Sequence, residues 1–163
     1  MTAFELVRVA TPLHFAQAAL VLGEQRAWAE DRLGGSLAEI QPSSRREYAC
    51  LADFYARPDG QLVLARLDGE PVGVIAVRRL ADGRGEGKRL YVRPAARGHG
   101  IGRRLIAELL RLARELGFGS LYVETSPQRM AAAYRMCVGL GFRETRKLGF
   151  RDLDHMVALE LPL

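Results

Sequence analysis

The sequence predicts a mixed α/β fold, with helices on both faces of a central sheet of about seven strands. Two observations lead to this prediction. The first half contains three consecutive strand-like segments joined by short turns, which is typical of an antiparallel meander. The second half continues as strand, helix and strand, a unit that places its two strands in parallel with a right-handed crossover. The combination predicts a mixed sheet covered by helices.

Length and composition fit one globular domain over residues 1–163. Hydrophobic residues make up 48% and charged residues 26% of the chain, which excludes a disordered protein. The chain has two cysteines, too few for a disulfide-built scaffold. It contains no run of about 20 apolar residues and no signal-peptide pattern at its start. We therefore expect a cytoplasmic protein that does not span a membrane.

The N-terminal third is predicted to form a strand and two helices. Residues 4–9 alternate loosely, as in a strand. A long helix should start at Thr11 and Pro12, a common pair at helix starts, and end near residue 33 before two glycines. Its predicted buried positions are Phe15, Ala19, Leu22 and Ala29. A second helix is expected from Ser43 or Ser44 to about residue 56.

The remaining elements are defined by turns and by periodicity. Strands are expected over 61–67, 72–80 and 86–93, separated by Gly-containing turns. A strongly periodic helix should follow over 103–116, then a strand over 120–124. A helix over 127–140 and two closing strands, over 143–148 and 155–161, complete the chain. The predicted inward face of the periodic helix consists of Leu105, Ile106, Leu109, Ala113 and Leu116.

The loop between the strand over 86–93 and the periodic helix carries the clearest functional signal. It contains Gly98, Gly100 and Gly102 directly before the helix, with Arg103 and Arg104 in the first turn. The first N–H groups of a helix lack partners and carry the positive end of its dipole, so they bind anions such as phosphates. Cations there are disfavoured by roughly 0.3–1 kcal/mol each. These residues therefore predict a bound anion.

The glycine spacing excludes two common phosphate loops. The segment lacks the Gly-Lys-Ser/Thr ending of a nucleoside-triphosphate P-loop. The dinucleotide fingerprint requires Gly-x-Gly-x-x-Gly, whereas Arg103 stands where its last glycine should be. A basic nucleic-acid module is disfavoured as well, because the arginines gather at one helix start and not along a face.

The segment Arg97-x-x-Gly100-x-Gly102 resembles the Arg/Gln-x-x-Gly-x-Gly/Ala motif of the GNAT superfamily of N-acetyltransferases. Residues 89–94 before the loop and the Leu140-Gly141-Phe142 segment are similar to other signatures of that family. The predicted order of elements also matches it over nearly the whole chain. The resemblance implies a mostly antiparallel sheet that splays open between its fourth and fifth strands.

The resemblance implies that acetyl-CoA is the cosubstrate and that no metal takes part. The pyrophosphate would lie on the loop, and the pantetheine arm along the end of the fourth strand, where an N–H near Val92 would polarise the thioester carbonyl. Arg103 or Arg104 could reach the 3′-phosphate. The residues expected to bind CoA are Leu90, Tyr91, Val92, Arg97, Gly98, His99, Gly100, Ile101, Gly102 and Arg103.

Transfer to an amine requires a base, because an amine with pKa near 10.4 costs roughly 4–5 kcal/mol to deprotonate at neutral pH. Glu86, at the start of the fourth strand, and Glu124, at the end of the fifth, both lie near the expected splay. Either carboxylate could accept the proton, directly or through water. The sequence does not decide between them.

The departing thiolate needs a proton or a hydrogen bond, and here the sequence departs from the family pattern. Family members commonly carry a tyrosine five residues before the phenylalanine of Leu-Gly-Phe, a place that Cys137 occupies here. Tyr134 lies about one helical turn earlier. We expect Tyr134 to be the acid, with Cys137 as the second choice or no side-chain acid at all.

The acceptor is expected to be a primary amine of a small molecule or a protein. We expect neither nucleic acid nor a membrane as partner, and the sequence is compatible with a monomer or a homodimer. The departure at Cys137 leaves a second interpretation open, a non-catalytic domain that binds or senses acyl-CoA.

Overall fold

The computed structural model describes residues 3–148 and 153–163. It contains a seven-stranded sheet with the order β1-β2-β3-β4-β5-β7-β6. Every neighbouring pair is antiparallel except β4 and β5, which are parallel. The predicted mixed, mostly antiparallel sheet with one parallel pair is therefore confirmed. The strands are β1 (Phe4–Arg8), β2 (Gly60–Leu67), β3 (Glu70–Arg79), β4 (Gly85–Val92), β5 (Ser120–Thr125), β6 (Arg143–Thr145) and β7 (Val157–Pro162).

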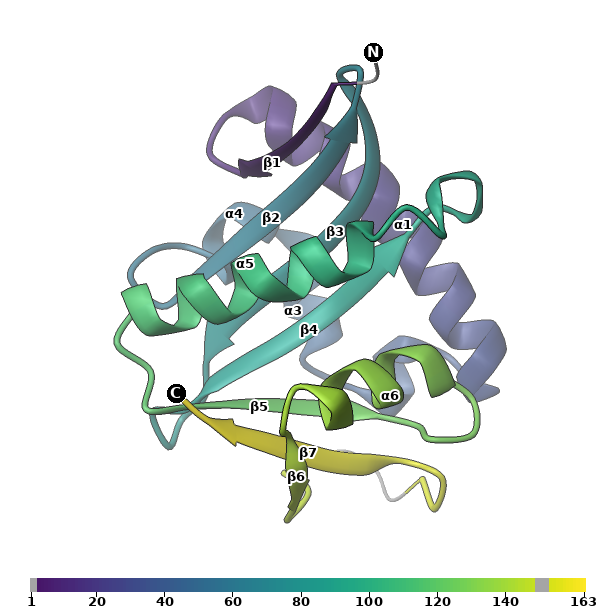
Figure 1. The fold of residues 1–163 in the computed structure, drawn as a ribbon, viewed down its shortest axis with the longest axis vertical. Helices are drawn as coiled ribbons and strands as arrows, with labels where there is room; N and C mark the ends of the chain where they lie inside the picture. The colour runs from purple at the N-terminus through teal and green to yellow at the C-terminus, as the bar shows by residue number, and fades with distance from the viewer. Residues whose placement is uncertain (1–2, 149–152) are drawn as a thin grey trace.

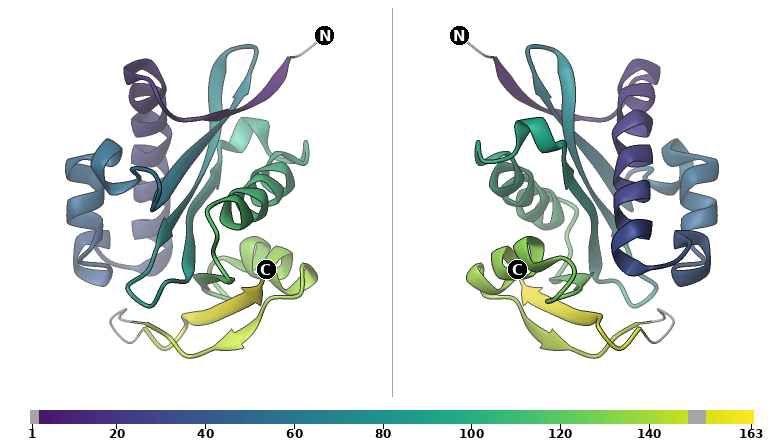
Figure 2. Two further views of the ribbon diagram at one scale, coloured as in Figure 1. Left: turned by 90° about the vertical axis from the view of Figure 1, so that its left-hand side faces the viewer. Right: turned by 90° about the vertical axis from the view of Figure 1, so that its right-hand side faces the viewer.

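Helices cover both faces of this sheet (Figures 1 and 2). The N-terminal helices pack on one face, and α5 and α6 on the other. The helices are α1 (Pro12–Leu33), α2 (Leu37–Ile40), α3 (Ser44–Ala49), α4 (Leu51–Phe54), α5 (Ile101–Glu115) and α6 (Ala131–Gly139), with a 3₁₀ turn, η1, at Pro94–Ala96. The crossover from β4 through α5 to β5 builds the parallel pair.

The long helices form where capping and periodicity predict them. Thr11 accepts a hydrogen bond from the N–H of His14, and Gly34 ends α1 in the left-handed conformation, with φ of 74°. Of the four apolar residues at helical spacing in α1, Leu22 and Ala29 are buried, Phe15 is half-buried and Ala19 is exposed. The inward face of α5 matches the prediction, except that Leu116 is only half-buried and Leu112 is buried too.

The predicted helix over 43–56 is wrong, because the chain forms two short helices there, α3 and α4, preceded by α2. Cys50 between them is extended, with φ of −153°, which interrupts helical hydrogen bonding. The helix predicted from residue 127 begins at Ala131 instead. Ser126 Oγ accepts the N–H of Arg129, and this side-chain bond holds a turn in place of the first helical turn. The strand predicted over 143–148 ends at Thr145.

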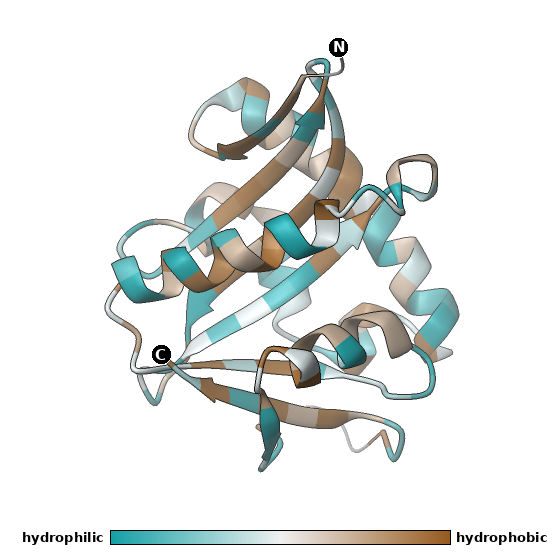
Figure 3. Cartoon of the chain, viewed as in Figure 1, coloured by the Kyte–Doolittle hydropathy of each residue, from teal (hydrophilic) through white to brown (hydrophobic). Residues whose placement is uncertain are grey.

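The two faces of the sheet bury separate apolar clusters. On the α5 face, Leu105, Leu112 and Leu121 are fully buried; on the α1 face, Val21, Leu22 and Leu64 are. Figure 3 shows β2 and β3 as largely hydrophobic, whereas β4 is mostly white or teal. A central strand of a sheet is usually apolar. The sequence Gly-Glu-Gly-Lys-Arg at the start of β4 therefore places buried charge in the middle of the fold.

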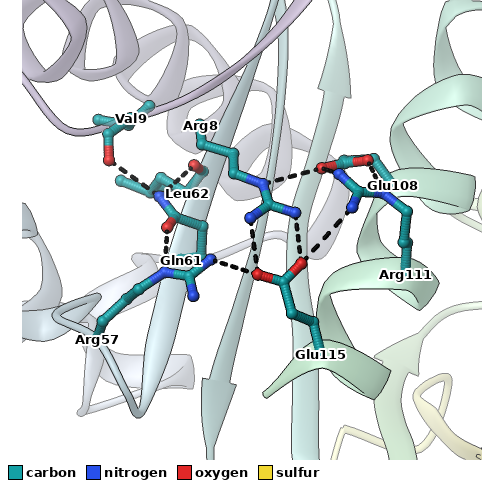
Figure 4. Close-up of polar contacts among 8 residues, drawn as sticks. All are labelled: Arg8, Val9, Arg57, Gln61, Leu62, Glu108, Arg111 and Glu115. Atoms are coloured by element: carbon teal, nitrogen blue, oxygen red, sulfur yellow. Dashed lines mark hydrogen bonds and ion pairs between the residues drawn. The ribbon is translucent and has the colours of Figure 1, made fainter.

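An exposed network of ion pairs fastens the C-terminal half of α5 to the sheet (Figure 4). Arg8 of β1 lies 2.6 Å from a carboxylate oxygen of Glu115 and 3.3 Å from one of Glu108. Arg57 and Arg111 also contact Glu115, at 3.3 and 3.6 Å. Each ion pair this exposed contributes little to the stability of the fold. All of these pairs lie in the C-terminal half of α5, away from its glycine-rich start.

A bulge in β4 marks the place where the sheet opens. Ala76 of β3 pairs with Lys88 and Val74 pairs with Tyr91, so two residues of β4 lie opposite one residue of β3. Arg89, one of the two, has φ of +64°, a rare conformation for a residue other than glycine. The pairing of β4 with β5 is confined to Gly85 and Glu86. The expected splay between the fourth and fifth strands is therefore present.

Candidate active site

The loop from η1 to α5 leads into a helix N-terminus that borders one cavity. Gly98 and Gly100 have φ of +82° and +74°, which side chains with a Cβ rarely adopt. Arg104 makes the first backward hydrogen bond of α5, from its N–H to the carbonyl of Gly100. The amides at the preceding positions of the helix start thus have no partner within it. The predicted anion-binding geometry of a helix N-terminus is present.

This loop borders what we call the phosphate-side cavity. It runs from the α5 start past the end of β4 to α1 and the turn before α6. Four of its lining residues are arginines, and none is acidic. The lining residues are Trp28, Arg32, Leu90, Tyr91, Val92, Ala96, Arg97, Gly98, Gly100, Ile101, Gly102, Arg103, Gln128, Arg129, Met130, Ala131, Ala132, Ala133 and Met136. His99, predicted to bind CoA, is not among them; its ring Nδ1 lies 3.0 Å from the carbonyl oxygen of Arg97.

The positive charge of this cavity is not balanced within the described part of the chain. No carboxylate there forms a salt bridge with any of the four arginines. Arg97 donates from Nε to the carbonyl of Val92 at 2.9 Å. Arg32 and Arg129 each donate to the other's main-chain carbonyl, at 3.4 and 3.1 Å. Such a cluster favours a ligand with several negative charges.

The two neighbouring arginines at the start of α5 point to different places. Arg103 lines the phosphate-side cavity. The Arg104 guanidinium lies 4.7 Å from the centre of the Phe4 ring, on β1. Of the two residues expected near a 3′-phosphate, only Arg103 therefore borders the cavity.

The end of β4 offers main-chain groups to the open side of the sheet. Arg93 donates its N–H to the carbonyl of Val72 on β3. Because neighbouring residues of a strand point their N–H groups in opposite directions, the N–H of Val92 faces away from β3, toward the splay. This direction is the one that a pantetheine arm or a thioester carbonyl would need.

A second cavity, which we call the splay cavity, lies between β4 and β5. It adjoins the phosphate-side cavity, with which it shares four lining residues: Trp28, Leu90, Met130 and Ala133. Its walls are mostly apolar and come from both faces of the sheet, including Leu33 of α1 and Leu109 of α5. Both predicted carboxylates, Glu86 and Glu124, line it, as does Cys137. The fold thus brings Glu86, Glu124 and Cys137 to one cavity beside β4.

Glu124 is the carboxyl group best suited to accept a proton. It accepts a short hydrogen bond from the Tyr122 hydroxyl on one oxygen, while Oε2 is buried with no partner in the described part of the chain. Burial, with the nearby charge of Glu86, raises the pKa of Glu124 to about 7, although the bond from Tyr122 acts in the opposite direction. A base with a pKa near the working pH is the most effective kind.

Glu86 is engaged differently. Its side chain is buried, and Oε2 lies 2.6 Å from Nε of Arg78 and 4.0 Å from Nζ of Lys88. One oxygen of this carboxylate is thus engaged by two cations. Burial lowers the pKa of Lys88 to about 8, against the opposing charges of Glu86 and Glu47. Glu86 therefore contributes negative charge beside Glu124 and is less available as a proton acceptor.

The two candidates for the acid occupy different surroundings. Cys137 is 8% exposed and lines the splay cavity. Tyr134 is half-buried, packs against the apolar cluster on the α5 face and lines neither cavity. Burial raises the pKa of the Cys137 thiol to about 11. The thiol thus stays protonated at neutral pH and can offer a weak hydrogen bond.

Several cavity residues were not predicted from the sequence. Arg32 and Arg129 lie 97 positions apart, and Trp28 belongs to a helix whose apolar side packs on the sheet. The Trp28 ring lies 6.0 Å from that of Tyr91, and its indole nitrogen is buried without a partner in the described part of the chain. No local motif could have revealed these positions, because only the approach of α1 to the turn before α6 brings them together.

No group of three or more His, Cys, Asp or Glu side chains within residues 3–148 and 153–163 could hold a metal ion. No helix in those ranges combines the length and apolar character needed to cross a bilayer.

Comparison with known proteins identifies the family. The model of the acetyltransferase (GNAT) family matches residues 26–142. An uncharacterized N-acetyltransferase of Schizosaccharomyces pombe is 31% identical over 111 residues, covering 67% of this chain and 68% of that protein. An IAA acetyltransferase of Azospirillum brasilense is 42% identical over 96 residues, covering 58% of this chain and 62% of that protein.

A solved structure shows the same fold. The PaiA N-acetyltransferase from Thermoplasma acidophilum, crystallised with coenzyme A, superimposes with a TM-score of 0.73 at 19% identity over 99% of both chains. At this identity the likeness concerns the fold. Together with the family match and the glycine loop beside an open pair of strands, it leaves one assignment: the chain belongs to the GNAT family and is an acetyl-CoA-dependent N-acetyltransferase.

Proposed function

We propose that this enzyme binds acetyl-CoA across its two joined cavities and transfers the acetyl group directly to a primary amine. The observation that carries the proposal is the junction itself. A cavity with four unbalanced arginines and a helix N-terminus adjoins, at Trp28, Leu90, Met130 and Ala133, a cavity lined by Glu124, whose Oε2 is buried with no partner in the described part of the chain. The first suits the phosphates of CoA, and the second suits proton removal from an amine.

In this proposal the loop over 97–102 holds the pyrophosphate through its amides. Arg97 and Arg103 add positive charge, and Arg103 contacts the 3′-phosphate. The main chain of β4 from Leu90 to Val92 pairs with the pantetheine arm. The Val92 N–H, which faces the splay, donates to the thioester oxygen as negative charge develops there. His99 contributes only its main chain.

The proton steps are assigned to the splay cavity. Glu124 accepts the proton that the amine nitrogen loses as it attacks the thioester carbon, and the carbon–sulfur bond then breaks. The Cys137 thiol, with a pKa of about 11, is a weaker acid than an ordinary thiol of pKa near 8.5. It therefore stabilises the departing thiolate by a hydrogen bond and does not give up its own proton. We prefer Cys137 to Tyr134 for this role because only Cys137 lines the cavity.

The acceptor is proposed to be a primary amine on a small molecule or a protein. The site needs no metal in this mechanism, since the amides, the arginines and one carboxyl group supply the required charges. A single domain over residues 1–163, a cytoplasmic location and a monomeric or homodimeric state stay predictions.

Calorimetric titration with acetyl-CoA tests the binding half of the proposal. We expect the unaltered protein to bind and the Arg97→Glu/Gly100→Glu variant to lose binding. A second arm follows release of free thiol with three probes: an alkylamine, a free amino acid and a lysine-containing peptide. Amine-dependent release supports direct transfer. If the unaltered protein fails to bind acetyl-CoA, the proposal is wrong.

A further inference from the structure

A cluster of buried charges lies behind the bulge of β4, on the α1 side of the sheet. Glu47 of α3 is completely buried, and Arg89 of β4 is 8% exposed. The guanidinium of Arg89 holds both oxygens of this carboxylate, from Nε to Oε1 at 2.8 Å and from a terminal nitrogen to Oε2 at 2.7 Å. This bidentate pair is the strongest geometry that an arginine and a carboxylate can form.

Other buried groups complete the cluster, so that both partners are well satisfied. The Tyr55 hydroxyl donates to Glu47 at 2.5 Å, and Gln41 accepts from Arg89 at 2.7 Å. Lys88 Nζ lies 3.1 Å from Oε2 of Glu47. Burial alone would raise the pKa of Glu47, but the bonds from Arg89 and the charges of Lys88 and Arg89 outweigh it and hold that pKa at about 2.

The cluster is attached to the one residue of β4 with an unusual backbone. Arg89 has φ of +64° and lies in the bulge between the part of β4 that pairs with β5 and the part that faces the splay. In a residue other than glycine this conformation is disfavoured, because Cβ comes too close to the following carbonyl oxygen. The sequence nevertheless has arginine there, and a strained residue persists only where its surroundings hold it.

We propose that Glu47 and Arg89 are positioning residues for acetyl transfer: their buried pair holds the β4 bulge, which presents Leu90–Val92 to the cosubstrate. The inference rests on the proposed placement of acetyl-CoA along β4. Glu47 belongs to a short helix on the α1 side, so the same pair links that helix to the strand that would carry the thioester. Arg89 also lines the splay cavity, and the proposed role requires no contact between either residue and the reacting atoms.

Two double variants separate the backbone role from the loss of charge. Glu47→Gln/Arg89→Ala and Glu47→Gln/Arg89→Gly remove the same ion pair, and neither leaves the Glu47 carboxylate unpaired. They differ in that glycine adopts a positive φ without strain and alanine does not. Calorimetry with acetyl-CoA measures the affinity of each, and thermal unfolding shows whether each is folded.

We expect the alanine double variant to lose at least tenfold in acetyl-CoA affinity. The glycine double variant should bind about fivefold or more tightly than the alanine variant, as the cost of the left-handed conformation indicates. Glu115→Gln serves as the structural control, because it disrupts an ion-pair network remote from both cavities. It should lower the unfolding temperature and leave the affinity for acetyl-CoA unchanged.

These measurements test the positioning role of Glu47 and Arg89 separately from the proposed function. Failure of the unaltered protein to bind acetyl-CoA refutes the proposed function. Binding by the unaltered protein together with equal affinities of the two double variants refutes the positioning role. If the alanine variant does not fold, the glycine variant decides: affinity within fivefold of the unaltered protein supports the inference, and a loss above tenfold overturns it.

Discussion

The phosphate-side cavity and the splay cavity share four residues, yet their charged groups differ. The first has four arginines and no acidic side chain; the second has two carboxylates, Glu86 and Glu124, and two cations, Lys88 and Arg89, among apolar walls. The charges of the first are exposed or half-exposed, whereas Glu86 is buried and one oxygen of Glu124 is inaccessible. This difference indicates that the two cavities have different roles in catalysis. One cavity should determine how tightly acetyl-CoA binds, and the other how fast it reacts.

The largest effect is expected at Glu124. Glu124→Gln removes the proton acceptor and should lower kcat by about 10²–10³-fold, within the usual contribution of general-base catalysis. The Kd for acetyl-CoA should stay within about twofold. Thiol release with an alkylamine and calorimetry measure the two quantities.

Glu144→Gln is the matched control for that change, because Glu144 lies exposed on β6. It should leave kcat and Kd as they are. A Glu124→Gln enzyme with full turnover would remove Glu124 as the base and leave Glu86 as the remaining candidate.

The next largest effect is expected in the pH dependence of kcat/KM, which the splay cavity should control, whereas acetyl-CoA affinity should not follow it. Burial raises the pKa of Glu124 to about 7, so the carboxylate that accepts the proton forms as the pH rises through 7. We expect kcat/KM to fall about tenfold for each pH unit below that value. The rate is measured from pH 5.5 to 8.5, and acetyl-CoA affinity over the same range should change little. Absence of this acid limb would contradict the assignment.

A change in the phosphate-side cavity should affect binding instead. Arg103→Ala should weaken acetyl-CoA binding by about fivefold, near the upper limit for one exposed ion pair. Arg104→Ala is the paired control, since that side chain packs on Phe4. Calorimetry at two salt concentrations measures both, because the Arg103 contribution should shrink as salt screens it. Equal losses of acetyl-CoA affinity in the two variants would contradict the conclusion that only Arg103 faces the cavity.

The smallest effect is expected at the thiol. Cys137→Ala should lower kcat by about two- to fivefold, because a thiol is a weak hydrogen-bond donor. Tyr134→Phe, which keeps the packing of the ring, should leave kcat unchanged. A large loss of kcat in Tyr134→Phe, with no loss in Cys137→Ala, would favour Tyr134 over Cys137 for this role.

Most of the fold could be predicted because it depends on local signals. The meander follows from its turns, and α5 follows from the spacing of Leu105, Leu109 and Ala113. The helix predicted over 43–56 was wrong because tertiary contacts outweighed local propensity there. Glu47 pairs with Arg89, and Tyr55, which follows the extended Cys50, donates its hydroxyl to Glu47. The helix is interrupted at Cys50 in this arrangement, and no glycine or proline in residues 44–55 predicts that interruption.

The sequence by itself determined the family, the glycine loop at the start of α5 and the identity of the two candidate carboxylates, because each depends on residues that are close together in the chain. Only the tertiary structure decided how those carboxylates differ. Arg78 pairs with Glu86, and burial beside Tyr122 leaves Glu124 with an unpaired oxygen. The tertiary structure also brings Arg32 and Arg129 to the phosphate-side cavity and pairs Glu47 with Arg89 in the β4 bulge. Desolvation and ion pairing depend on which distant segments pack together, and sequence spacing does not contain that information.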